Sequence, residues 1–164
     1  MKLLLVCILT LIFMTGCSND ERTALINDFN ATLIQSSPLR INEGLKEIEL
    51  TVINDVQWDS GIIELRLVNH TEHMITYGEP FSIEFFDGES WQRVQFPDDV
   101  AFVSIGYGLG PGEASYFTRH LNFLLPNGLI QTGQYRLRMH IFNDADIPIR
   151  ENDLHDLVAE FYVE

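Results

Sequence analysis

Hydrophobic and polar residues alternate with a period of two along most of the chain after residue 46. Ile48, Leu50 and Val52 alternate with polar residues, and several later segments repeat this pattern. Alternation of this kind is typical of β-strands that bury one face and expose the other. It predicts strands near residues 48–52, 63–67, 81–85, 91–96, 115–118, 135–141 and 157–163.

Turn residues separate the predicted strands. Asp87-Gly88 follows the third strand and is typical of a hairpin. Pro111-Gly112 precedes the fifth strand, where glycine permits a positive φ after proline. No long segment has a helical period, so a parallel α/β fold would lack its crossover helices. The pattern therefore predicts an all-β fold, an antiparallel β-sandwich of about seven strands.

The first residues carry a different pattern. Lys2 precedes an apolar run from Leu3 to Met14, and Gly16 stands directly before Cys17. The run is shorter than the roughly 20 apolar residues that a membrane-spanning helix needs, so it is typical of a secretory signal instead. With a cysteine at its end it resembles a bacterial lipoprotein signal. The resemblance implies that Cys17 is the lipid attachment residue and the first residue after cleavage.

These patterns divide the chain into three parts. Residues 1–16 are predicted to be a lipoprotein signal peptide, residues 17–44 a lipidated N-terminus with a short tether, and residues 45–164 the sandwich domain. Within the tether, Leu25, Ile26 and Phe29 begin a partial helical stripe, which Ser36-Ser37 interrupts. We therefore expect a tether with at most one poorly formed helix.

Charge and cysteine content limit the classes of partner. The formal net charge is −14, which disfavours binding to nucleic acid or to anionic lipid headgroups. Membrane affinity would then come from the lipid anchor. Cys7 would leave with the signal and Cys17 would be acylated, so no thiol would remain for a disulfide. The domain would be stabilised by packing alone.

A family resemblance rests on aromatic and turn residues between positions 46 and 164. They are Tyr77-Gly78, Phe81 to Phe85, Asp87-Gly88, Trp91, the turn from Leu109 to Glu113, Gly133 to Leu137, and Ala159 to Phe161. Together they resemble a bacterial immunoglobulin-like domain of small surface lipoproteins. The resemblance implies an extracytoplasmic immunoglobulin-like sandwich and supplies no catalytic residues. By comparison with antibody-type sandwiches, Trp91 is expected to plug the space between the sheets and Tyr135 to form a tyrosine corner.

The segment between Pro97 and Pro111 is apolar and aromatic, although a connection is normally polar. Phe102, Ile105 and Tyr107 are the candidate partner-binding residues, because loops at sandwich ends carry recognition. An alternative is that Phe102 and Ile105 cover the core or form an additional short strand.

Candidate chemistry is sparse. Asn143, Asp144 and Asp146 belong to the densest cluster of oxygen ligands, so calcium is a candidate ligand there. No other metal site and no other cofactor is predicted. The sequence contains no GxSxG motif, and no catalytic residue is assigned.

These observations favour a membrane-anchored extracytoplasmic lipoprotein carrying a non-catalytic immunoglobulin-like interaction module. Its partner would be a surface protein or glycan, and its location the outer face of a bacterial membrane, the plasma membrane of a Gram-positive cell first. Two alternatives stay open: a protease inhibitor that uses the 98–110 loop, and a small hydrolase of unrecognised type.

Overall fold

The computed structural model of the protein describes residues 33–36, 39, 47–56, 61–121, 131–143 and 154–163. These residues form nine strands and no helix. Accordingly, the described part of the chain contains no helix with the length and apolar character needed to cross a membrane.

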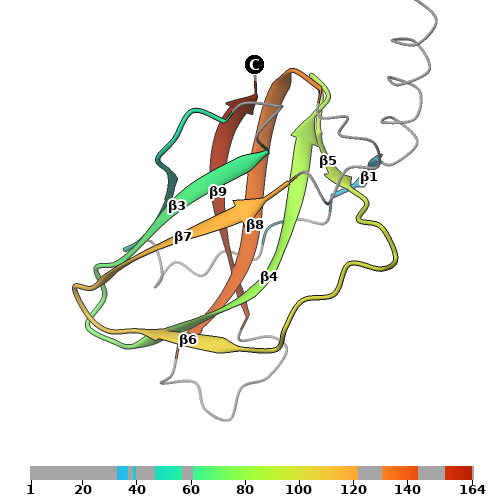
Figure 1. Ribbon diagram of the computed structural model, residues 1–164. Helices are drawn as coiled ribbons and strands as arrows, with labels where there is room; N and C mark the ends of the chain where they lie inside the picture. The colour runs from blue at the N-terminus through green and yellow to red at the C-terminus, as the bar shows by residue number, and fades with distance from the viewer. Residues whose placement is uncertain are drawn as a thin grey trace, which may run out of the picture.

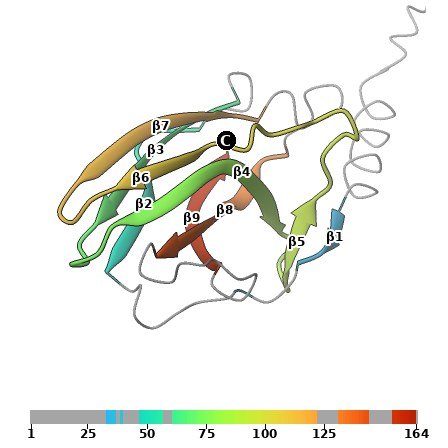
Figure 2. The same cartoon turned by 90° about the horizontal axis from the view of Figure 1, so that it is seen from below.

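The strands form two antiparallel sheets that lie face to face (Figures 1 and 2). The larger sheet has the order β1-β5-β4-β8-β9, with β6 also paired to β4, and the smaller sheet has the order β2-β3-β7. The bounds are β1 Leu33–Gln35, β2 Ile48–Val52, β3 Ile62–Asn69, β4 Ile75–Phe86, β5 Trp91–Val94, β6 Gly106–Leu109, β7 Ala114–His120, β8 Gly133–Asn143 and β9 His155–Val163.

The core lies between the sheets and is built by alternate residues of each strand. Ile63, Leu65 and Leu67 of β3 are fully buried, and they face Leu137 and Ile141 of β8, which are fully buried as well. Burying a large aliphatic side chain stabilises a fold by about 1.5–3 kcal/mol, so this double layer of apolar side chains is the main source of stability.

All seven strands expected from the alternation are present, and two more are added. One is β6, the glycine-rich edge strand on β4. The other is β1, which pairs with β5 where we expected tether and helical character. Both are short, and four or fewer residues carry too little alternation to be recognised in a sequence.

Two turns have the predicted geometry. Gly88 and Gly112 adopt φ values of 101° and 73°, the left-handed region that glycine enters without strain. In the first turn Asp87 accepts hydrogen bonds from the backbone N–H groups of Ser90 and Glu89. These bonds lower the pKa of the Asp87 carboxyl.

Two aromatic residues were assigned roles by analogy, and one assignment is wrong. Tyr135 is buried, and its hydroxyl donates to the backbone carbonyl of Gln131 at 2.9 Å, which confirms the tyrosine corner. Trp91 is not the plug between the sheets. Its ring contacts Phe86 and lies 4.3 Å from the Arg136 guanidinium, on the face of the larger sheet that points away from the core. The strand alternation places Trp91 there, because the core-facing position of β5 belongs to Val94.

Candidate functional site

The outer face of the larger sheet carries charged side chains that are withdrawn from solvent. On β8 the core side chains alternate with Arg136, Arg138 and His140, which therefore point to the outer face. The two arginines are only 8% exposed, and Glu84 on the neighbouring β4 is fully buried. Charged residues are rarely this buried unless they are paired, so their partners define the site.

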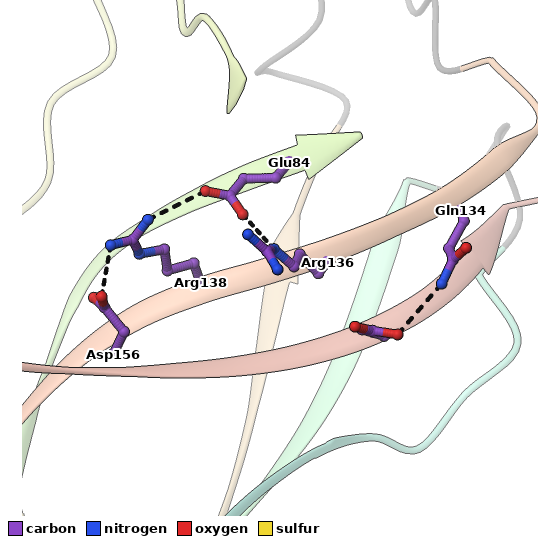
Figure 3. Close-up of polar contacts among 6 residues, drawn as sticks. Glu84, Gln134, Arg136, Arg138 and Asp156 are labelled. Atoms are coloured by element: carbon purple, nitrogen blue, oxygen red, sulfur yellow. Dashed lines mark hydrogen bonds and ion pairs between the residues drawn. The ribbon is translucent and has the colours of Figure 1, made fainter. Parts of the chain in front are cut away.

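The partners form a ladder of ion pairs across three strands (Figure 3). Glu84 accepts from the Nε of Arg136 and, at 3.4 Å, from Arg138. Arg138 also donates to Asp156 of β9 at 2.5 Å, and the second oxygen of Asp156 lies 2.8 Å from His140 Nδ1. Two carboxylates thus neutralise two guanidinium groups, and a half-exposed imidazole ends the ladder.

The pKa of Arg138 reflects this pairing. Burial disfavours its charge, but the hydrogen bond and charge of Asp156, with the charge of Glu84, outweigh burial and raise the pKa of Arg138. The guanidinium stays charged and holds two carboxylates at fixed positions. The ladder fixes the register of β4, β8 and β9, because a shift of one residue would turn every charged side chain into the core.

A groove adjoins the ladder on the same face. It consists of two pockets of about 420 Å³ and about 360 Å³ that share Pro80, His140 and Leu154. We call these pockets together the outer groove. The first is further lined by Ser82, Glu84, Arg93, Phe96, Phe102 and Arg138, and the second by Tyr77, Ser104, Ile105 and Phe142.

The predicted partner-binding residues lie in two environments. Phe102 is partly buried and packs on the core, with its ring 5.3 Å from that of Phe81. Ile105 and Tyr107 are 50% and 37% exposed, next to and within β6. The Tyr107 hydroxyl donates to Glu79 at 2.8 Å, a bond that raises the pKa of this phenol. The core-covering alternative therefore holds for Phe102, and the additional strand begins at Gly106.

The family of the chain is decided by a comparison with protein-family models. The model described as a bacterial Ig-like domain matches residues 44–161, most of the chain. The chain belongs to this family. No curated protein matches the sequence.

Several solved structures match the chain at low sequence identity and low TM-score. The ASH / PapD-like domain of human CEP192 is 13% identical, with a TM-score of 0.39, covering 80% of this chain and 93% of that one. The archaellum periplasmic stator protein FlaG from Sulfolobus acidocaldarius is 15% identical, with a TM-score of 0.35 and coverages of 70% and 98%. The archaellum periplasmic stator protein complex of FlaF and FlaG from the same organism is 16% identical, with a TM-score of 0.36. That match covers 77% of this chain and 99% of the other.

Two sets of predicted residues fall at or beyond the limits of the described structure. Cys17 lies outside the described residues, as do the calcium candidates Asp144 and Asp146; Asn143 is the last residue of β8. Among the residues that are described, no three His, Cys, Asp or Glu side chains converge as ligands for a metal ion.

The His140–Asp156 pair of the Ig-like domain is half of a catalytic triad in composition. A hydrolase would also need a nucleophile within hydrogen-bond reach of the imidazole. Within the described ranges, no hydroxyl group hydrogen-bonds to His140. Asp156 is also shared with Arg138, so its charge is already neutralised by a guanidinium. The pair is better explained as the end of the ion-pair ladder.

Most residues of the ladder and of the outer groove were not predicted as site residues from the sequence. Alternation between residues 135 and 141 puts Arg136, Arg138 and His140 on one face of the predicted strand, but no local pattern connects them to Glu84, Arg93 and Asp156. These residues lie on four different strands. They are brought together by the register of the larger sheet. In that register Glu84 stands opposite Arg93 and Arg136, and His140 stands opposite Asp156.

Proposed function

We propose that this Ig-like domain is a lipid-anchored, extracytoplasmic module that binds a surface protein or glycan without catalysing a reaction. The proposal rests on the exposed apolar side chains of Val103, Ile105 and Tyr107, which are 59%, 50% and 37% exposed. Apolar side chains clustered on one exposed segment are typical of an interaction surface. We call these three residues the apolar segment.

The position of the apolar segment supports this proposal. It leads into β6, which pairs with β4 on one side and with no other strand among the described residues. Tyr107 is anchored by Glu79 and lies 5.4 Å from the ring of Tyr77, so its ring is held in a fixed position. A fixed aromatic side chain binds with a smaller entropy cost than a mobile one.

The proposed location rests on the sequence. A short apolar run that ends at Gly16-Cys17 is typical of a lipid-anchored exported protein. A net charge of −14 gives no electrostatic attraction to anionic lipids, so two or more acyl chains on Cys17 would supply the membrane affinity.

In-cell crosslinking followed by mass spectrometry tests the proposal. The native protein is compared with a Val103→Ser, Ile105→Ser variant and with a control variant, Tyr116→Ser, Tyr162→Ser. The control removes side chains that are 66% and 57% exposed elsewhere on the domain. We expect one partner that is captured by the native and control proteins and lost in the first variant.

Other results would change the assignment. Capture that is unaffected by the Val103/Ile105 variant would place the binding surface elsewhere, and a failure to capture any partner would contradict a binding module. A captured protease that is inhibited by the domain would favour the inhibitor hypothesis instead. That hypothesis must use residues 98–105, because Gly106–Leu109 are part of the larger sheet.

A further inference from the structure

The outer groove differs in chemistry from one end to the other. The end beside β5 is lined by Arg93 and Ser82, and the end beside β6 by Ile105, Phe142 and Leu154. One end therefore offers a cation and a hydroxyl, whereas the other offers apolar surface.

Arg93 is the available cation of the groove. It is exposed, and its guanidinium makes no ion pair with any described residue. Glu84 stands opposite Arg93 in the sheet register, but its carboxylate is bound to Arg136 and Arg138. The ladder thus occupies the carboxylate that stands opposite Arg93 and leaves the guanidinium donors of Arg93 for an external acceptor.

The apolar end is open because glycines line it. Gly78 and Gly106 pair across β4 and β6, and both line this end. A Cβ atom at Gly106 would lie 3.0 Å from the Thr76 methyl group, and one at Gly78 would lie 3.1 Å from Pro80 Cδ, so a larger residue at either position would crowd its neighbour. The absence of side chains at these positions leaves a shallow pocket beside Ile105 and Phe142.

The two ends are too far apart for a small molecule. From Glu84, beside Arg93, to Gly78, beside Gly106, β4 extends about six residues, which corresponds to about 20 Å at about 3.3 Å per residue. An extended peptide of about the same number of residues spans this length.

We propose that the outer groove binds an extended peptide segment of the partner, with one carboxylate on Arg93 and one apolar side chain in the pocket of Ile105, Phe142 and Leu154. The two side chains are separated by about six residues of extended chain. The proposal names the partner chemistry of the binding module and so rests on the proposed function. A net charge of −14 repels strongly acidic segments, so a single well-placed carboxylate is favoured over an acidic run.

Selection from a library of random dodecapeptides displayed on phage tests this specificity. The bait is the full chain, purified as the cell makes it. We expect enriched peptides to combine Asp or Glu with Leu, Ile, Phe or Trp about six residues away. No enrichment, or enrichment of peptides without an acidic residue, would overturn the proposal.

A charge exchange makes the test specific to Arg93. Binding of one enriched synthetic peptide is measured by fluorescence anisotropy, and we expect Arg93→Glu and Arg93→Gln each to weaken it at least tenfold. Replacing the peptide carboxylate by lysine should restore binding to Arg93→Glu. The control is Arg66→Glu, the same charge change on the smaller sheet, which should leave binding within twofold. Equal effects of the Arg93 and Arg66 changes would contradict the proposal.

The two proposals fail in different ways. If the partner captured in cells is lost in the Val103/Ile105 variant but kept by Arg93→Glu, the binding module stands and the outer groove is not its peptide site. If no partner is captured, the proposed function falls first.

Discussion

The contribution of a charged residue on the outer face to stability depends on how deeply its side chain is buried as well as on its charge. Arg136 has a carboxylate on each neighbouring strand, since Glu84 and Glu160 both stand opposite it in the sheet register. Glu84 is fully buried and bound to two guanidinium groups, whereas Glu160 is exposed and accepts from Gln134. The same residue type at equivalent register positions therefore has two different energetic roles.

The two glutamates give a matched prediction for stability. Glu84→Gln should lower the free energy of unfolding by about 3–5 kcal/mol, because it leaves Arg136 and Arg138 buried without a full countercharge. Glu160→Gln should change it by less than about 0.5 kcal/mol, as is usual for an exposed site. Urea denaturation measures both. Equal, small losses would mean that solvent reaches the buried guanidinium groups.

Tyr135 gives a prediction for alkaline pH. Burial raises the pKa of its phenol well above the ordinary value of 10.0, despite the opposing hydrogen bond to Gln131. The folded state therefore keeps the proton after the unfolded state has lost it. Its contribution is complete below about pH 10 and decreases as the pH rises further.

The measurement is the free energy of unfolding between about pH 8 and 11.5. Stability should fall above about pH 10 in the native protein, and Tyr135→Phe should reduce this fall. Tyr162→Phe is the control, because this side chain is 57% exposed. An unchanged alkaline loss in Tyr135→Phe would assign the titration to other groups.

At the scale of elements, one asparagine joins the smaller sheet to the end of β6 in the larger sheet. The amide of Asn69, at the end of β3, donates to the carbonyls of His73, Leu109 and Gly110. Its backbone carbonyl accepts from Gly112, the residue that needs a positive φ. Asn69 thus fixes where β6 leaves the larger sheet and β7 enters the smaller one.

This role predicts a local effect on β6 and the turn after it. Asn69→Ala should cost about 3 kcal/mol, because buried carbonyls lose their donor, and should increase amide exchange at Gly112. Asn54→Ala is the control. Asn54, which follows β2, bonds to Ile62 and Glu64 of β3, so its loss should leave exchange at Gly112 unchanged. Unchanged exchange at Gly112 in Asn69→Ala would contradict the role of Asn69.

At the scale of the whole molecule, the proposed lipid anchor precedes the part of the chain that the structure describes. Cys17 lies outside the described residues, and the first described strand begins at Leu33.

Fractionation of cells tests the anchor. Cys17→Ser should move the protein from the membrane to the soluble fraction, because the diacylglycerol attachment is lost. Cys7→Ser is the control and should leave the protein in the membrane fraction. Retention of Cys17→Ser in the membrane would contradict lipidation.

The sequence by itself determined seven of the nine described strands, the fold class and the turns at Gly88 and Gly112. Alternation along each strand depends only on neighbouring residues, and so do the Asp87-Gly88 and Pro111-Gly112 turns. These features could therefore be predicted without knowing which strands pair. The same alternation explains why Arg136, Arg138 and His140 of β8 point away from the core. The expected role of Trp91 was wrong. The analogy to antibody domains considered only the residue type and did not consider which face of the strand the side chain points from.

Only the tertiary structure decided which strands are neighbours and therefore which side chains meet. Glu84, Arg93 and Asp156 are far apart in sequence, and strand order and register bring them to one face of the larger sheet, on the strands next to β8 or one strand away. Burial was decided at the same level, because the outer face of a sandwich is normally solvated, yet Glu84 is fully buried. A local pattern specifies the face of a strand, whereas pairing between distant strands sets the contacts on that face.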